Sequence, residues 1–123
     1  METAIKDYGS SKNDIAITVT ENFNITTNLT IPANAYGKNL TIKGDVATRT
    51  LTRNVNTNLF TINGSAKLVF ENIIVDGNKD NYSYNTSSLV YIDGGEFTMK
   101  GGAVLTNNHC FFSDSGSGVL VNI

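Results

Sequence analysis

The sequence has few of the residues that carry the commonest kinds of protein chemistry. Among 123 residues there are one cysteine, one histidine, one proline and no tryptophan. A single cysteine excludes an internal disulfide framework, so packing and hydrogen bonds must stabilise the fold. Cys110 adjoins His109, but a zinc site needs three or four ligands, and a nucleophile pair needs adjacency in space rather than in sequence. We therefore interpret Cys110 as a small apolar packing residue.

Charge and long apolar runs are also scarce. Charged residues make up 16% of the chain and the net charge is -2, so there is no basic surface and nucleic acid is not expected as a partner. No apolar run approaches the ~18 residues of a membrane helix, and we expect no membrane insertion. The acidic start, with Glu2 after Met1, does not resemble a signal peptide. Good helix formers never cluster, which indicates an all-β chain.

The sequence does contain a repeated segment. Residues 59–78 hold three short apolar runs closed by Asp76-Gly77-Asn78, and each run has the length and composition of a β-strand. The three runs recur in the same order about 30 residues later. Phe60 aligns with Val90 and Val119 at successive shifts of 30 and 29, Leu68 with Phe97 at 29, and Ile73 with Ala103 at 30.

Such a period predicts stacked turns. Repeats of 20 to 50 residues with three short strands each are typical of a β-solenoid with a triangular cross-section. Leu29 and Leu40 begin equivalent strands upstream, and residues 48–53 form a more polar third strand. We predict a parallel β-helix of about three to four turns of roughly 30 residues. Residues 1–14, with one helical turn, would form an N-terminal cap segment, and residues 15–123 a single β-helix domain.

The period of two along each strand predicts which side chains face the core. Thr61, Val69 and Ile74 would face outward, and their neighbours would face inward. The last strand, from Val119 to Ile123, is followed by no capping element, although a solenoid end exposes unpaired backbone groups. We expect the domain to be truncated at its C-terminal end or covered there by a partner, with end-to-end self-association through this strand as an alternative. The inward set is Phe60, Ile62, Leu68, Phe70, Ile73 and Val75, with Val90, Ile92, Phe97, Met99, Ala103 and Leu105 stacked upon it.

Several segments resemble the repeats of a known family. Asn39-Leu-Thr-Ile-Lys-Gly44, Leu68-Val-Phe-Glu-Asn-Ile73 and Glu96-Phe-Thr-Met-Lys-Gly-Gly102 are similar to repeats of adhesin-like right-handed β-helix proteins of microbial cell surfaces, which have the pectin-lyase-like fold. The resemblance implies a right-handed β-helix and an extracellular, cell-surface location. It specifies architecture more than activity, because this fold hosts lyases, hydrolases and passive stalks alike.

We expect a non-catalytic surface adhesin or stalk, without a cofactor, whose partner is a host or cell-surface glycan or protein. One alternative is a fragment of a polysaccharide lyase or glycoside hydrolase, which would place acidic residues, a basic residue or calcium on adjacent turns of one face. Asp76 and Asp93 instead fall at corners of different sides, and Arg49 and Arg53 lie on an irregular early turn. Another alternative is a self-assembling module that pairs through its open end.

Two insertions carry the candidate binding residues. Residues 78–88 and 108–118 both follow the third strand of a turn, so we expect them to leave the column at one corner and to stack. Insertions on one face of a repeat array commonly carry binding, and aromatic side chains among Asn and Ser suit carbohydrate or protein surfaces. Alternatively, Phe111 or Phe112 folds back over the core. The candidate residues are Tyr82, Tyr84, His109, Phe111 and Phe112.

The first of these insertions also resembles half of a calcium loop. Asp76, Asn78 and Asp80 would supply oxygen ligands at alternate positions. Asn81 stands where the loop needs Gly, and Ser87 stands where it needs the closing Glu. We therefore predict no metal site, with calcium as a weak candidate.

Overall fold

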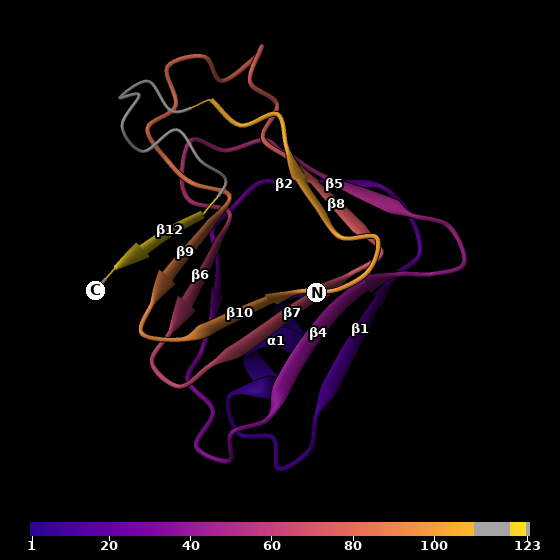
Figure 1. Ribbon diagram of the computed structural model, residues 1–123, viewed down its shortest axis with the longest axis vertical. Coiled ribbons are helices and arrows are strands. Elements are labelled where there is room, and N and C mark those ends of the chain that lie inside the picture. The colour runs from indigo at the N-terminus through magenta and orange to yellow at the C-terminus, as the bar shows by residue number, and fades with distance from the viewer. Residues whose placement is uncertain (110–118, 123) are drawn as a thin grey trace.

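The protein is a three-sided column of parallel β-strands. The computed structural model describes residues 1–109 and 119–122. Three sheets, with strand orders β1-β4-β7-β10, β2-β5-β8-β11 and β3-β6-β9-β12, form the sides of a triangle, and every strand pair within them is parallel. Seen along the column, the chain runs counterclockwise as it approaches the viewer, so the β-helix is right-handed (Figure 1).

Each turn of the chain supplies one strand to each sheet. The strands are short, and most of them are followed by a corner of polar residues or glycine. Their bounds are β1 Ile15–Val19, β2 Phe23–Ile25, β3 Leu29–Ile31, β4 Asn39–Gly44, β5 Arg49–Arg53, β6 Phe60–Asn63, β7 Lys67–Glu71, β8 Ile73–Asp76, β9 Val90–Asp93, β10 Glu96–Met99, β11 Val104–Thr106 and β12 Val119–Asn122.

The sequence repeat is the register of the sheets. Phe60 pairs with Val90, which pairs with Val119, at the predicted shifts. Leu68 pairs with Phe97 in the same way. The upstream strands also align as predicted, because Leu29 pairs with Phe60 and Leu40 with Leu68. The prediction of a parallel β-helix is therefore confirmed.

The core fills the interior of the triangle. The inward side chains of the middle turns, such as Ile62 and Leu68, are completely buried. Phe70 lies between Phe60 and Phe97, with ring centroids 5.0 and 5.1 Å apart and both pairs edge to face. Phe60 and Phe70 lie in consecutive strands of one repeat and Phe97 lies in the next, so the contact between Phe70 and Phe97 adds to the sheet pairing along the column.

Two side chains differ from the predicted alternation. Val69 was expected to face solvent, yet only 5% of it is exposed, because it lies between Thr41 and Thr98 in the two neighbouring strands. Met99 was expected to face the core, yet it is 44% exposed. In the described part of the chain, β10 is the last strand of its sheet, so no turn covers Met99.

A short helix covers part of the N-terminal end. Helix α1, Glu2–Tyr8, lies behind the triangle in Figure 1 and packs against β1 and β3. Its buried residues are Ile5 and Tyr8. The Tyr8 hydroxyl donates to Lys38 O at 2.6 Å and accepts from the Lys67 backbone N–H at 3.0 Å. One side chain therefore joins the cap to two turns of the column.

We expect Tyr8→Phe to lower the free energy of unfolding by about 1–3 kcal/mol, because a buried donor and acceptor lose their partner.

The variant should also change how the free energy of unfolding falls at alkaline pH. Burial raises the pKa of Tyr8, Asp14 adds to this rise, and the Lys67 hydrogen bond opposes it. A raised phenol pKa contributes stability that is present below the unfolded value of about 10 and is lost as pH rises through the folded value. Thermal unfolding across alkaline pH should show a steeper loss in wild type than in Tyr8→Phe, and parallel curves would contradict the role of the hydroxyl.

Candidate functional site

The long loops gather at one corner of the column. The second sheet, β2-β5-β8-β11, leads at that corner into the third sheet, and Figure 1 shows the loops of successive turns together there. We call residues 54–59, 77–89 and 107–109 the loop corner. Both predicted insertions begin at it. Of the predicted site residues, Phe111 and Phe112 lie outside the described residues, as does Cys110.

Asn85 joins the two insertions. Its side chain is 1% exposed, and its Nδ2 donates to Ser87 O at 2.8 Å, His109 O at 3.1 Å and Asn108 Oδ1 at 3.3 Å. Asn108 Nδ2 returns a hydrogen bond to Ser87 O at 3.1 Å. A buried side-chain amide that donates hydrogen bonds to two loops fixes the position of one loop relative to the other. The loops of these two turns therefore contact one another through amide groups.

The described aromatic candidates lie on this framework. The Tyr82 hydroxyl donates to Asn54 Oδ1 at 3.0 Å, so this half-buried ring joins residues 77–89 to the loop of the preceding turn. Tyr84 is 77% exposed. His109 is exposed, and its backbone carbonyl is the one that accepts from Asn85.

Beneath the loop corner lies a completely buried arginine. Arg53 Nη1 donates to Val55 O at 3.0 Å and to Thr57 O, both in its own loop. Nη2 donates to Ser88 O at 3.3 Å and to Asn108 Oδ1 at 3.2 Å. The guanidinium thus connects loops from three successive turns.

The environment of this guanidinium is unusual because its acceptors are neutral. Within the described residues, Nε has no hydrogen-bond partner. Burial lowers the pKa of Arg53, since a charge without water or a counter-ion is disfavoured. Arg53 was expected on a polar, irregular strand, and its burial was not predicted. The alternation offered a signal, because Leu51 faces inward and Arg53 has the same parity.

Two of the three calcium candidates, Asp76 and Asn78, make hydrogen bonds where the chain enters the loop corner. Asp76 Oδ1 accepts from the Asn78 backbone N–H at 2.7 Å and from Asn107 Nδ2 at 2.9 Å. Asn78 adopts a left-handed backbone, with φ of 51°, and its Nδ2 donates to Arg53 O at 3.0 Å. Asp80 is exposed. The described residues contain no group of three or more His, Cys, Asp or Glu side chains that could hold a metal ion.

Gly77 allows the two insertions to approach each other. A Cβ atom at this position would lie 2.5 Å from Asn108 Cα and 2.7 Å from Asn107 O. We expect Gly77→Ala to lower the free energy of unfolding by about 1–3 kcal/mol, because backbone must move. The matched control is Gly101→Ala, where a Cβ would meet nothing within 4 Å. Chemical unfolding measures the change in the free energy of unfolding for both variants. Equal changes would show that the backbones of the two insertions are not in tight contact at Gly77.

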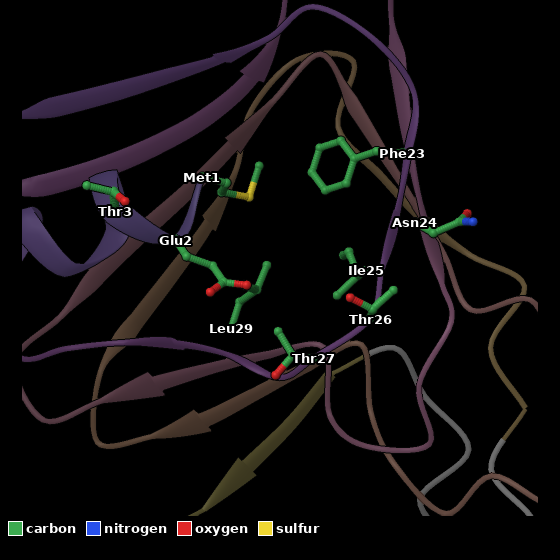
Figure 2. A pocket seen from close by; sticks show the side chains of 9 residues that line it. All are labelled: Met1, Glu2, Thr3, Phe23, Asn24, Ile25, Thr26, Thr27 and Leu29. Atoms are coloured by element: carbon green, nitrogen blue, oxygen red, sulfur yellow. The ribbon is translucent and has the colours of Figure 1, made fainter.

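A hollow lies at the N-terminal end, between the start of α1 and β2. It has a volume of about 490 Å³, and the side chains of Met1, Phe23, Ile25 and Leu29 border it (Figure 2). Asn24 points away from it. The short helix packs mainly on β1 and β3. We therefore interpret it as the unfilled part of the cap.

No protein-family model, curated protein or solved structure matches the chain. Within the described residues, no helix is long and apolar enough to cross a membrane.

Proposed function

We propose that the protein is a non-catalytic adhesin or stalk module of a cell surface, and that its loop corner binds a glycan or a protein. The observation that carries the proposal is the network under the loops. Arg53 and Asn85, both buried, fix loops from three successive turns by hydrogen bonds. Loops held in one conformation lose less entropy when they bind, which favours affinity.

The placement of the acidic side chains supports a non-catalytic role. Asp76 ends β8 and Asp93 ends β9, so these two carboxylates lie at different corners of the column. Asp76 already accepts two hydrogen bonds that hold the loop entry. A hydrolase or lyase of this architecture needs acidic and basic groups that converge on one substrate bond. The lyase or hydrolase alternative would require such a cluster elsewhere.

The cell-surface location rests on the repeat segments that resemble surface β-helix proteins. The column itself suits a stalk, because each turn contacts only its neighbours and length can increase by adding turns. Binding then falls to the loops, since the sheets supply the rigid support. This division matches the contrast between the buried strands of the middle turns and the exposed Tyr84.

The proposal is tested by binding to an array of immobilised cell-surface glycans and to cell-surface proteins. We expect the double variant Tyr82→Ala with Tyr84→Ala to lose binding. The matched control is Tyr36→Ala, because Tyr36 is 51% exposed in the connection between β3 and β4, outside the loop corner. Unchanged binding by the double variant would show that the loop corner is not the site. Absence of binding by the wild type to any member of either set would contradict the proposal as a whole.

The open face of the last turn favours one other function, self-assembly. Strands β10 and β11 are the last of their sheets in the described part, with Met99 44% and Val104 43% exposed. Phe97 and Leu105 are only half-buried. A free edge beside apolar side chains can pair with another copy. Sedimentation equilibrium should then give a mass that rises with concentration in wild type but not in Met99→Lys, and a constant monomer mass would contradict self-assembly.

A further inference from the structure

Strand β10 has one open side in the described part of the chain, because it is the last strand of its sheet there. The Glu96 N–H donates to Ala66 O of the preceding turn at 2.8 Å. Successive residues of a strand direct their backbone groups to opposite sides, so those of Phe97 and Met99 point toward the open side. A sheet edge of this kind is a template for pairing with another strand.

The apolar side chains at this edge are incompletely covered. Phe97 packs edge to face on Phe70, with ring centroids 5.1 Å apart, but it is only half-buried. Met99 pairs with the completely buried Phe70 and so lies on the inward face, yet it is 44% exposed. A strand laid against β10 would therefore gain backbone hydrogen bonds and remove apolar surface from water.

The sequence of this edge is complementary to itself. Residues 96–100 read Glu-Phe-Thr-Met-Lys, so two copies can lie antiparallel with Thr98 opposite Thr98. Glu96 then lies opposite Lys100 of the second copy, and Phe97 lies opposite its Met99. Opposed residues of an antiparallel pair point to the same face, so opposite charges meet outside and apolar side chains meet inside. In this register Phe97 and Met99 also form the hydrogen-bonded pairs, which uses the backbone groups on the open side of β10.

The neighbouring charges favour this arrangement over a head-to-tail stack of columns. Glu96 lies 3.9 Å from Lys67, and Lys100 lies beside Glu71 when the pairing of β10 with β7 is continued by one residue. Antiparallel pairing therefore extends an alternation of Lys and Glu from one copy to the other. Pairing of β10 with β1 of a second copy would instead place Glu96 beside Asp14, because these residues share one column of the sheet. Helix α1 also packs on β1 and β3 at that end.

We propose that the partner of this open edge is a second copy of the chain, joined by antiparallel pairing of β10 with β10 about a two-fold axis at Thr98. The inference rests on the self-assembly given above as a second function, because it assigns a partner and a register to the same edge. A two-fold contact uses the same surface on both copies and is closed, so it gives a dimer and not a filament.

Sedimentation equilibrium of the wild-type protein tests the closed dimer. A contact of one short strand pair is small for a specific interface, so we expect a dissociation constant on the order of 10–100 µM. The weight-average mass should rise with concentration and level off at twice that of the monomer. A mass that keeps rising past two copies would overturn the dimer and leave self-assembly standing.

Two charge variants test the opposition of Glu96 and Lys100. Glu96→Lys sets lysines opposite lysines, and Lys100→Glu sets glutamates opposite glutamates, so each alone should dimerise about tenfold or more weakly than wild type. An equimolar mixture should form a heterodimer with about the wild-type affinity, because every lysine then meets a glutamate. The matched control is Glu21→Lys, the same change in charge at an exposed corner between β1 and β2, and it should dimerise as wild type does. A mixture that stays monomeric, or a control weakened equally, would overturn the register.

Cross-linking tests the position of the two-fold axis. Residues of a non-hydrogen-bonded antiparallel pair have Cα atoms about 4.5 Å apart, which a disulfide can span. In a chain with Cys110 replaced by Ser, Thr98→Cys should oxidise to a covalent dimer about tenfold or more faster than Thr18→Cys, an exposed position of β1. Equal rates would overturn the register and leave self-assembly standing. A monomer mass for wild type up to about 1 mM would overturn self-assembly and the inference together, whereas binding at the loop corner is judged by its own experiment.

Discussion

Phe70→Ala is expected to lower the free energy of unfolding by about 3–5 kcal/mol, which is among the largest effects in the chain. The ring is completely buried and contacts Phe60 and Phe97 edge to face, so its removal deletes contacts to two other strands and leaves a cavity between turns. The surrounding strands are held by pairing on both sides of β7 and cannot collapse to fill the space.

Urea unfolding followed by circular dichroism measures this change. Tyr36→Ala serves as the control, because that ring is 51% exposed and its loss should alter stability by no more than about 0.5 kcal/mol. A loss below about 1 kcal/mol for Phe70→Ala would mean that the interior of the column is not close-packed around this ring.

Arg53→Ala is expected to cost a similar amount, about 3–5 kcal/mol, for a different reason. The substitution removes the arginine donor from the carbonyls of Val55 and Thr57, leaves Ser88 O with only the Leu59 N–H, and empties the space beneath the loops. The loss should be concentrated at the loop corner, so amide hydrogen exchange in residues 54–59 and 77–89 should rise more than in β4 and β7.

The matched control is Arg49→Ala. Arg49 makes an ion pair with Asp45 near the surface, and its side chain is 27% exposed, so its removal should have a much smaller effect. Equal losses for the two variants, or an even rise in exchange along the whole chain, would contradict the role of Arg53 as the organiser of the corner.

The architecture could be predicted because it is repeated. Phe60, Val90 and Val119 occupy one column of a sheet, and the spacing between them is visible in the sequence. The alternation of inward and outward side chains also follows from strand geometry. Two side chains depart from it because of the strands beside them. Val69 is covered by flanking threonines, whereas Met99 loses its cover at the edge of the sheet. Neither effect is encoded in the strand that shows it.

The interior of the loop corner could not be predicted in the same way. Arg53 and Asn85 are buried, although both residue types ordinarily lie at the surface. Several of their partners lie far away in sequence, since Arg53 reaches Ser88 and Asn108 from two later turns. Tyr82 and His109 were placed at this corner by the repeat arithmetic, because the position of an insertion follows from the period. The polar network that supports them depends on loop conformations that have no period.

The NMR spectrum of the Arg53 side chain, recorded on protein labelled with ¹⁵N-arginine, shows whether one buried cation organises the loop corner. We expect slowly exchanging guanidinium protons with nuclear Overhauser effects to Thr57, Ser88 and Asn108, which come from three turns of the column. Arg49 supplies the comparison within the same sample. A guanidinium that exchanges as fast as that of Arg49, or that shows no contact with Ser88 and Asn108, would contradict the claim that one buried cation organises the loop corner.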